Sequence, residues 1–312
     1  MGNNRNLHKA STEKKDEYYT KITDIEKELK HYNEYFKNKI VFCNCDDPEY
    51  SNFWKYFELN FDKLGLKKLI STHYEENKPS YKLELVKDTN KDGKINRLDI
   101  IKTPLKQNGD FRSSECIDIL KEVDVVVTNP PFSLFREYIA QLIEYKKDFL
   151  IIGNQNALTY KELFPLFKTN KMWIGYNSGA QEFRVPDNYE RDNIYIGADG
   201  HKYAKFGNIT WYTNLEVSKR HEKIILYKKY NELEYPKYDD YDAINVSKVN
   251  EIPCDYKGKM GVPVTFLERF NPQQFELIGI DRYLEDNPNY GRRFKINGKE
   301  IYARIVIVNK EG

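Results

Sequence analysis

Apolar residues show two different patterns of spacing along the first part of the chain. They recur at helical spacing over 22–36, form a short run at 39–45, and reach another run at 66–72 through a second helical pattern. A helical period indicates a helix with one buried face, whereas a short unbroken apolar run indicates a buried strand. The order strand, helix, strand therefore predicts a parallel βαβ unit.

The most strand-like run of the chain, at 122–128, leads directly into Asn129-Pro130-Pro131-Phe132. A helical pattern with Ser133 as its expected cap comes next, and 149–153 predicts a further buried strand. Beyond residue 175, short strand-like segments with clustered aromatic residues dominate, ending in a strand-like run at 301–308. These patterns predict an α/β protein with an open, largely parallel sheet.

Two segments between these regions predict a β-hairpin. Residues 81–86 and 94–101 alternate in polarity and flank a turn at Asn90–Gly93. The stretch Asp88–Asp99 also has the oxygen side chains and the glycine of a calcium-binding loop. Such a loop normally adjoins a helix, whereas the segment before this one alternates like a strand. We therefore favour the hairpin and expect no metal site.

Composition narrows the class of protein. The 312 residues carry a formal net charge of +2, so the chain is not one of the strongly basic proteins that cover nucleic acid. Aromatic residues make up 14% of the chain, which argues against disorder. No apolar run in the sequence approaches the length of a membrane span. The four cysteines show neither a disulfide framework nor a zinc-ligand spacing. We expect a cytoplasmic globular protein that has no membrane partner.

The sequence predicts chemistry at the tetrapeptide Asn129–Phe132. In open parallel sheets, ligands bind at the carboxyl ends of the strands, and this tetrapeptide follows such a strand. Its two prolines lack a backbone N–H, so carbonyl oxygens remain to face a ligand. The side-chain carbonyl of Asn129 and the adjacent backbone carbonyl can accept both hydrogens of an exocyclic amine, while Phe132 offers a face to a flat heterocycle. A simple turn after the strand is the alternative.

The same tetrapeptide matches the catalytic motif of amino-group methyltransferases that use S-adenosylmethionine. From around residue 13 onward the chain resembles the EcoRI-type adenine-specific DNA methyltransferases, in the stretches KDEYYTKITDIEKEL, IVFCNCDDPEYSNF, GDFRS, VVVTNPPF and MGVPVTFLERFNPQQFELIG. This resemblance implies a Rossmann-like class I methyltransferase fold with S-adenosylmethionine as cofactor. It also implies methyl transfer to the exocyclic N6 amine of a flipped adenine at a specific DNA site, in a restriction-modification context.

The resemblance assigns roles to individual residues. It implies that Asn129, Pro130, Pro131 and Phe132 are catalytic, and that Asn129 also lies in the cofactor site. The further cofactor-binding residues that it implies are Tyr18, Tyr19, Thr20, Asp46, Pro48, Asp110 and Phe111. Asp46 and Pro48 occupy the turn after the first strand, where this superfamily usually has a Gly-x-Gly loop that this chain lacks. The alternative is that Asp46 and Asp47 only cap the next helix, with Pro48 as its first residue.

The implied domain order is a flexible tail at 1–12, an S-adenosylmethionine-binding catalytic core at 13–175, and the remaining core strands interwoven with a target-recognition region at 176–312. The residues expected to contact double-stranded DNA are Arg184, Lys202, Lys205, Lys219, Arg220, Arg292 and Arg293, beside Tyr189, Tyr195 and Tyr203. For each of them an ordinary solvated position is the alternative. A cognate restriction endonuclease could share the DNA site without forming a stable complex, and we expect a monomer.

Other functions stay open on sequence alone. Motifs of the form Asn-Pro-Pro-aromatic also serve the methylation of RNA adenine and of protein glutamine, but Phe132 and the family resemblance favour DNA. A non-catalytic DNA- or calcium-binding module would be a different class of protein. The intact Asn129, Asp110 and Tyr19 argue against that class.

Overall fold

The computed structural model describes residues 18–45, 47–86, 88–93, 95–190 and 194–311. The chain forms two compact units, of which the first comprises Met1–Gln155 and Gly175–Leu215 and the second comprises Asn156–Ile174 and Glu216–Gly312. The chain therefore leaves the first unit, begins the second, and returns to add further strands to the first.

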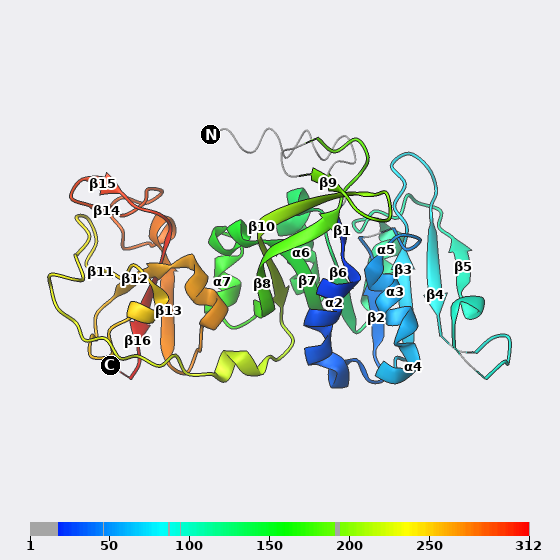
Figure 1. The fold of residues 1–312 in the computed structure, drawn as a ribbon, viewed down its shortest axis with the longest axis horizontal. Coiled ribbons are helices and arrows are strands. Elements are labelled where there is room, and N and C mark those ends of the chain that lie inside the picture. Colours follow the sequence, from blue (N-terminus) through cyan, green and yellow to red (C-terminus); the bar gives the residue numbers. More distant parts are fainter. Residues whose placement is uncertain (1–17, 46, 87, 94, 191–193, 312) are drawn as a thin grey trace. The chain divides into compact units, whose positions relative to one another are not determined.

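The first unit is built on a ten-stranded sheet in the part of the chain that the structure describes (Figure 1). Nine strands lie in the order β1 (Tyr19–Thr20), β8 (Trp173–Arg184), β10 (Lys202–Thr213), β7 (Asp148–Asn154), β6 (Val125–Thr128), β2 (Ile40–Cys43), β3 (Lys68–Thr72), β4 (Tyr81–Leu85) and β5 (Ile101–Pro104), and β9 (Ile194–Ile196) pairs with β10. The central strands β3, β2, β6 and β7 are parallel neighbours, as in the pairs Phe42↔Ile70 and Phe42↔Val126. The predicted parallel βαβ unit is thereby confirmed.

The strand order reverses at β2, which lies between the later strands β3 and β6. Connections from the two sides of such a point run in opposite directions and leave a crevice at the carboxyl ends of the strands. Antiparallel strands extend the sheet on both sides, with β10 next to β7 and β4 next to β3. A ligand site is therefore expected where β2 and β6 end, at residues 44 and 129.

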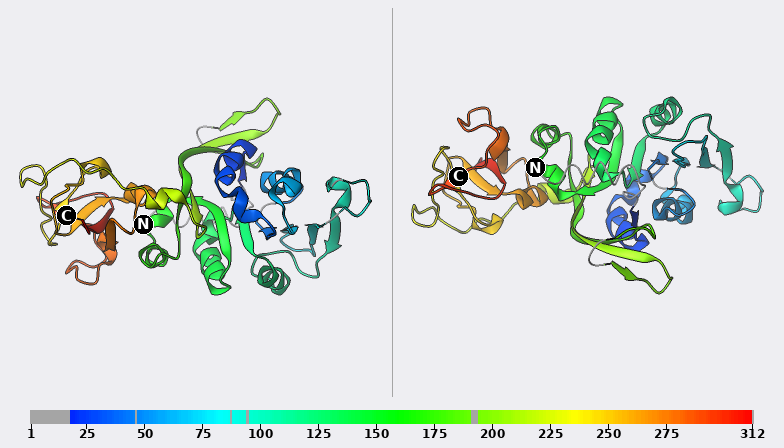
Figure 2. Two further views of the ribbon diagram at one scale, coloured as in Figure 1. Left: turned by 90° about the horizontal axis from the view of Figure 1, so that it is seen from below. Right: turned by 90° about the horizontal axis from the view of Figure 1, so that it is seen from above.

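Helices cover both faces of this sheet (Figures 1 and 2). The helices of the first unit are α2 (Ile22–Leu29), α3 (Asn52–Leu59), α4 (Phe61–Leu64), α5 (Ser114–Glu122) and α6 (Phe135–Glu144). Figure 2 shows α2 and α3, in blue, on one side, and α5 and α6, in blue-green and green, on the other. Trp211 and Tyr212 are fully buried neighbours on β10; Trp211 packs against Phe53 of α3 and Tyr212 packs against Phe135 of α6. Because successive strand residues point to opposite faces, one strand anchors both helical layers.

Several predicted element boundaries were wrong. The helix predicted over 22–36 is α-helical only to Leu29 and continues as a 3-10 helix, η1 (Lys30–Phe36). The next helix begins at Asn52, not at Pro48, because the Ser51 hydroxyl caps it by accepting from the N–H groups of Phe53 and Trp54.

Asp47 does not cap this helix, since its carboxylate accepts from the Glu49 N–H in the turn before it. Asp46 lies outside the described residues. The expected cap Ser133 lies in a 3-10 turn, η3 (Phe132–Leu134), and α6 begins after Leu134 without a side-chain cap. Helix α5 was not predicted, because its burial rests on only a few apolar positions between charged ones.

The hairpin prediction was right in its first strand and wrong in its second. Residues 81–85 form β4, but the partner strand β5 lies at 101–104, with Glu84 opposite Ile101. The intervening segment folds on itself, because the Asp99 carboxylate accepts from the N–H groups of Thr89, Asn90 and Asn96. Among the residues that the structure describes, no cluster of three or more His, Cys, Asp or Glu side chains could hold a metal ion.

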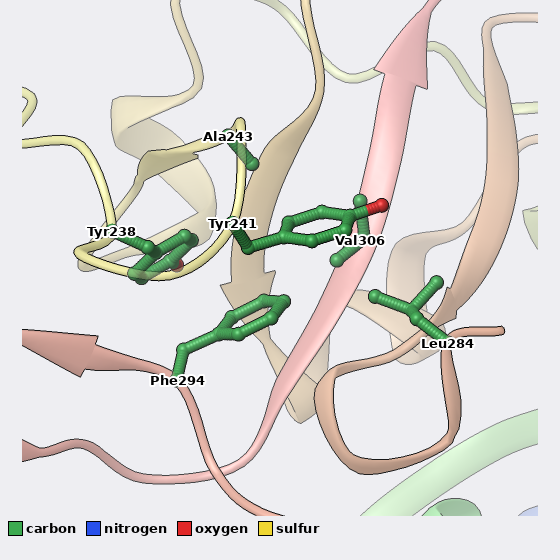
Figure 3. Packing of buried hydrophobic residues seen from close by; sticks show 6 residues of the cluster. All are labelled: Tyr238, Tyr241, Ala243, Leu284, Phe294 and Val306. Carbon is green, nitrogen blue, oxygen red and sulfur yellow. The ribbon is translucent and has the colours of Figure 1, made fainter. Parts of the chain in front are cut away.

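The second unit contains a four-stranded sheet and a separate short hairpin. Its sheet has the order β11 (Ile244–Asn245), β12 (Met260–Pro263), β16 (Arg304–Asn309) and β13 (Phe275–Ile280). The hairpin pairs β14 (Lys295–Ile296) with β15 (Lys299–Glu300), and among the described residues the α-helix of this unit is α7 (Phe164–Lys168). Figure 3 shows the Phe294 ring facing both Tyr238 and Tyr241. Its centroid lies 4.4 Å from that of Tyr238 and 4.9 Å from that of Tyr241. Over the described ranges, no helix combines the length and apolar character needed to cross a bilayer.

Candidate active site

Asn129 lies directly after β6 with only 6% of its surface exposed. Its side-chain Nδ2 donates a hydrogen bond to the backbone carbonyl of Tyr18, which immediately precedes β1. The other end of the amide, Oδ1, is buried and has no hydrogen-bond partner among the described residues. A buried acceptor left without a partner is costly, so this oxygen is suited to receive a donor from a bound molecule.

The residues after Asn129 give this acceptor a rigid surrounding. Pro130 is buried, and Pro131 leads into the 3-10 turn that starts at Phe132. Each proline fixes its own backbone angle and lacks an N–H donor, and the Pro131 carbonyl accepts a hydrogen bond from the Leu134 N–H, which closes the turn. The sequence predicted Asn129 and the Pro130 carbonyl as a pair of acceptors for an amine, and that role stays a prediction.

Aromatic rings surround this turn. The ring of Tyr18 lies 5.7 Å from that of Phe132 and 4.9 Å from that of Phe206, a half-buried residue of β10. Phe183 and Tyr189 contact the same ring edge-on. Tyr189, proposed from sequence as a DNA contact, is only 5% exposed and belongs to this cluster. A cluster of tilted and edge-on aromatic rings therefore adjoins the Asn129–Phe132 turn.

The N-terminal motif is fixed to two other elements. Tyr19 pairs with Arg184 across the β1–β8 ladder, and the guanidinium group of Arg184 lies over the Tyr19 ring. The Thr20 carbonyl accepts a hydrogen bond of 2.7 Å from Asn52 at the start of α3. Pro48 is buried in the turn between β2 and α3. The structure thus places Tyr19, Thr20 and Pro48 on the elements next to the carboxyl end of β2.

The turn at 109–112 depends on a glycine. Gly109 has φ +80°, and a Cβ atom there would lie 1.8 Å from the His73 carbonyl oxygen. Asp110 follows, and its carboxylate accepts two hydrogen bonds from the Arg112 guanidinium, at 2.8 and 2.7 Å. Burial raises the pKa of Asp110, but Arg112 outweighs burial and leaves this pKa below its usual value. The carboxylate therefore stays ionised and can accept a further donor, such as the amino group of an adenine.

Two residues at the site were not predicted. Asn44, at the end of β2, accepts a hydrogen bond from the hydroxyl of Tyr138 on α6, which is fully buried. The same Tyr138 ring packs edge-on against Phe111, with centroids 5.0 Å apart. A polar Asn closing an apolar run was a usable signal for Asn44. Nothing in the sequence pointed to Tyr138, because this residue lies on the apolar face of its helix like the other buried residues there.

Some of the basic residues expected to contact DNA have partners inside the protein, whereas others are exposed. The Arg220 guanidinium lies 3.7 Å from the Trp173 ring centroid and donates to Asn170, and Arg293 donates to the fully buried Asp281. These two side chains have internal partners within the second unit. Lys205 and Arg292 are exposed.

An open sheet with parallel central strands, a reversal of strand order, and an Asn-Pro-Pro-Phe turn at the end of β6 together define an amino-group methyltransferase of the Rossmann-like class. Comparison with known proteins agrees with this class. Residues 6–310 match the family described as adenine-specific methyltransferase EcoRI.

Among its relatives, the chain is 50% identical to the type II methyltransferase M.EcoRI of Escherichia coli, over 98% of this chain and 97% of the relative. It is 39% identical to M.MgeORF184P of Mycoplasma genitalium and to M.MpnI of Mycoplasma pneumoniae, both type II methyltransferases, over 98% of this chain and 99% and 98% of theirs. No solved structure matches the chain.

The chain belongs to the EcoRI family of adenine-specific methyltransferases. It is accordingly an S-adenosylmethionine-dependent DNA methyltransferase of restriction-modification type. The predictions of family, fold class, enzyme and cofactor are confirmed.

Proposed function

We propose that the first unit methylates the exocyclic N6 amine of an adenine turned out of the DNA duplex, with Asn129 and the Pro130 carbonyl as acceptors for its two hydrogens. A base stacked in a duplex is out of reach of a buried acceptor, so the base must leave the helix. The observation that carries the proposal is the buried Oδ1 of Asn129 without a partner, oriented by the bond from Nδ2 to Tyr18.

The proposed chemistry follows from the hydrogen bonds. An amine that donates both hydrogens to carbonyl oxygens keeps its nitrogen lone pair free on the remaining side. S-adenosylmethionine, when bound, would supply a methyl group attached to a positively charged sulfur. After the transfer this sulfur is part of a neutral thioether, which makes it a good leaving group. The new C–N bond forms as the C–S bond breaks, and the N6 nitrogen then loses a proton to water. Positioning therefore matters more than a strong base, and Phe132 stacks on the adenine ring.

We assign the cofactor to the residues at the ends of β2 and β6 and in the neighbouring turn. Tyr18, Tyr19, Thr20 and Asn129 hold its methionine end, while Asp110 and Phe111 hold its adenine by a hydrogen bond and a ring contact. Pro48 shapes the turn after β2, and we keep Asp46 as a candidate for the cofactor's amino group. The ionised Asp110 and the buried ring of Phe111 suit these roles.

Double-stranded DNA is the proposed macromolecular partner, and we propose residues 176–312 for its recognition, interwoven with the last core strands. Lys205 and Arg292 are the exposed cations best suited to phosphate contact. We propose a monomeric enzyme, because a single active site is enough for methyl transfer. We propose that any cognate endonuclease shares the DNA site without a stable complex.

The test uses the purified protein, labelled S-adenosylmethionine and unmethylated genomic DNA, followed by single-molecule sequencing for methyladenine. We expect label at adenine within one short motif and none with Asn129→Ala. Retained cofactor binding without any transfer to DNA would overturn the proposal and direct attention to RNA or protein acceptors.

A further inference from the structure

We infer that Tyr138 and Gln141 of α6 are positioning residues, which hold the 109–112 turn in the geometry that receives the cofactor's adenine. The inference rests on the proposed roles of Asp110 and Phe111. It adds two residues that contact neither the reacting amine nor, in this assignment, the cofactor itself.

Side chains of α6 contact Phe111 and Arg112 of this turn directly, and Asp110 through Arg112. The Gln141 amide donates from Nε2 to the Phe111 carbonyl at 3.1 Å, and the Tyr138 ring meets the Phe111 ring edge-on at 5.0 Å. One turn earlier, Glu137 accepts from Arg112 at 3.5 Å, and Arg112 in turn holds the Asp110 carboxylate. Residues four apart on a helix lie on one face, so 137 and 141 approach the turn together.

Tyr138 connects this turn to the end of β2. Its ring contacts Phe111 while its hydroxyl donates to Asn44 Oδ1. Complete burial raises the pKa of Tyr138 well above its usual value, so the hydroxyl keeps the proton that it donates. One side chain therefore sets both the Phe111 ring and the Asn44 amide.

The position of α6 in the chain makes this arrangement more than local packing. The helix starts directly after η3, the turn that contains Phe132, so its first turn is continuous with the proposed amine-binding turn. The same rigid helix thereby fixes the distance between the proposed adenine site of the cofactor and the acceptors for the target amine. We therefore expect a change at Tyr138 or Gln141 to alter the adenine site of the cofactor and to leave the turn with the amine acceptors in place.

The experiment compares Tyr138→Phe and Gln141→Met with wild type in the full-length protein. Tyr138→Phe keeps the ring contact and removes the hydrogen bond to Asn44, while Gln141→Met keeps the volume and removes the donor to Phe111. Tyr302→Phe is the matched control, because Tyr302 is 89% exposed. Each α6 variant should weaken binding of labelled S-adenosylmethionine about three- to tenfold, the effect of one hydrogen bond, and raise its KM equally.

The expected pattern separates positioning from general stability. At saturating cofactor, kcat should stay within about twofold of wild type, and the affinity for DNA without cofactor should not change. A Tyr138→Leu change, which removes the ring contact, should cost less in cofactor affinity when Phe111 is already alanine, because the two rings act as a pair.

Phe111→Ala is the reference that distinguishes this inference from the proposed function. If Phe111→Ala weakens cofactor binding but neither α6 variant does, the positioning role is wrong and the proposed function stands. If Phe111→Ala leaves cofactor binding unchanged, the proposed adenine site is wrong and the inference fails with it. A lower melting temperature with unchanged cofactor affinity would show that Tyr138 and Gln141 serve stability alone.

Discussion

The side chain of Asn129 donates to the backbone carbonyl of Tyr18, a residue 111 positions earlier in the sequence. This bond decides which end of the amide faces the site. Since a carbonyl oxygen can only accept, Nδ2 must point to Tyr18, and Oδ1 is left toward a ligand. The N-terminal motif thus acts on the proposed reaction through its backbone as well as through its side chains.

Replacing Asn129 by alanine or aspartate should reduce methyl transfer at least about 100-fold, the usual effect of losing one oriented polar group from an active site. Alanine has no acceptor, and an aspartate carboxylate has no donor for the Tyr18 carbonyl. Binding of S-adenosylmethionine, measured by equilibrium dialysis, should weaken by only a few-fold, because Asn129 is one of several residues proposed at the methionine end of the cofactor. Substantial turnover by Asn129→Asp would show that the bond to Tyr18 does not set the orientation.

Gly109→Ala should damage cofactor binding by moving the turn that carries Asp110. A methyl group there would collide with the His73 carbonyl, and φ +80° is strained for a residue with a side chain. We expect at least about a tenfold loss of cofactor affinity, together with a loss of about 1–3 kcal/mol in stability. Gly298→Ala is the control, since its φ is +75° but its Cβ would meet no atom within 4 Å. Equal effects of the two variants on cofactor affinity would contradict the prediction.

Glu28→Gln should destabilise the first unit, although it removes a buried charge. The Glu28 carboxylate accepts hydrogen bonds from the Tyr32 hydroxyl, from the Tyr176 N–H, and from both the N–H and the amide of Asn177. A glutamine amide would place a donor against one of these donors, at a cost of about 1–3 kcal/mol. Urea unfolding checks this, with exposed Glu232→Gln as control. A more stable Glu28→Gln protein would mean that burial of the charge dominates.

Asp99 should make the stability of the 88–99 segment depend on acid pH. Burial raises the pKa of Asp99, but hydrogen bonds from Thr89, Asn96 and Asn90 outweigh it and lower the pKa from 3.8 to about 2. Because the folded pKa is the lower one, the stabilisation is complete above the unfolded pKa and is lost as the pH falls through about 2.

The check for Asp99 is the difference in free energy of unfolding between wild type and Asp99→Asn. This difference should be constant above about pH 5 and shrink as the pH falls from about 4 to 2. A difference that is independent of pH would show that the carboxylate is not held in its ionised form.

The sequence was informative wherever the signal is local. Apolar runs identified β2, β3, β6 and β7, because a strand buried on both faces must be apolar along its length. The rigid Asn-Pro-Pro-Phe turn could also be predicted from local sequence, because prolines restrict their own backbone wherever they occur. Helix starts were less readable: Ser51 and Asp47 are both good caps, and only the path of the chain after β2 decides between them.

By itself, the sequence determined the family, the parallel core strands with the helices α3 and α6, and the residue types at the proposed site. Tertiary structure alone decided how those residues meet. It placed the Tyr18 carbonyl against Asn129, aimed Tyr138 at both Asn44 and Phe111, gave Arg220 and Arg293 internal partners, and moved the second hairpin strand to 101–104. Local patterns encode which face of an element is buried, whereas the partner of a buried polar atom depends on folding that joins residues far apart in sequence.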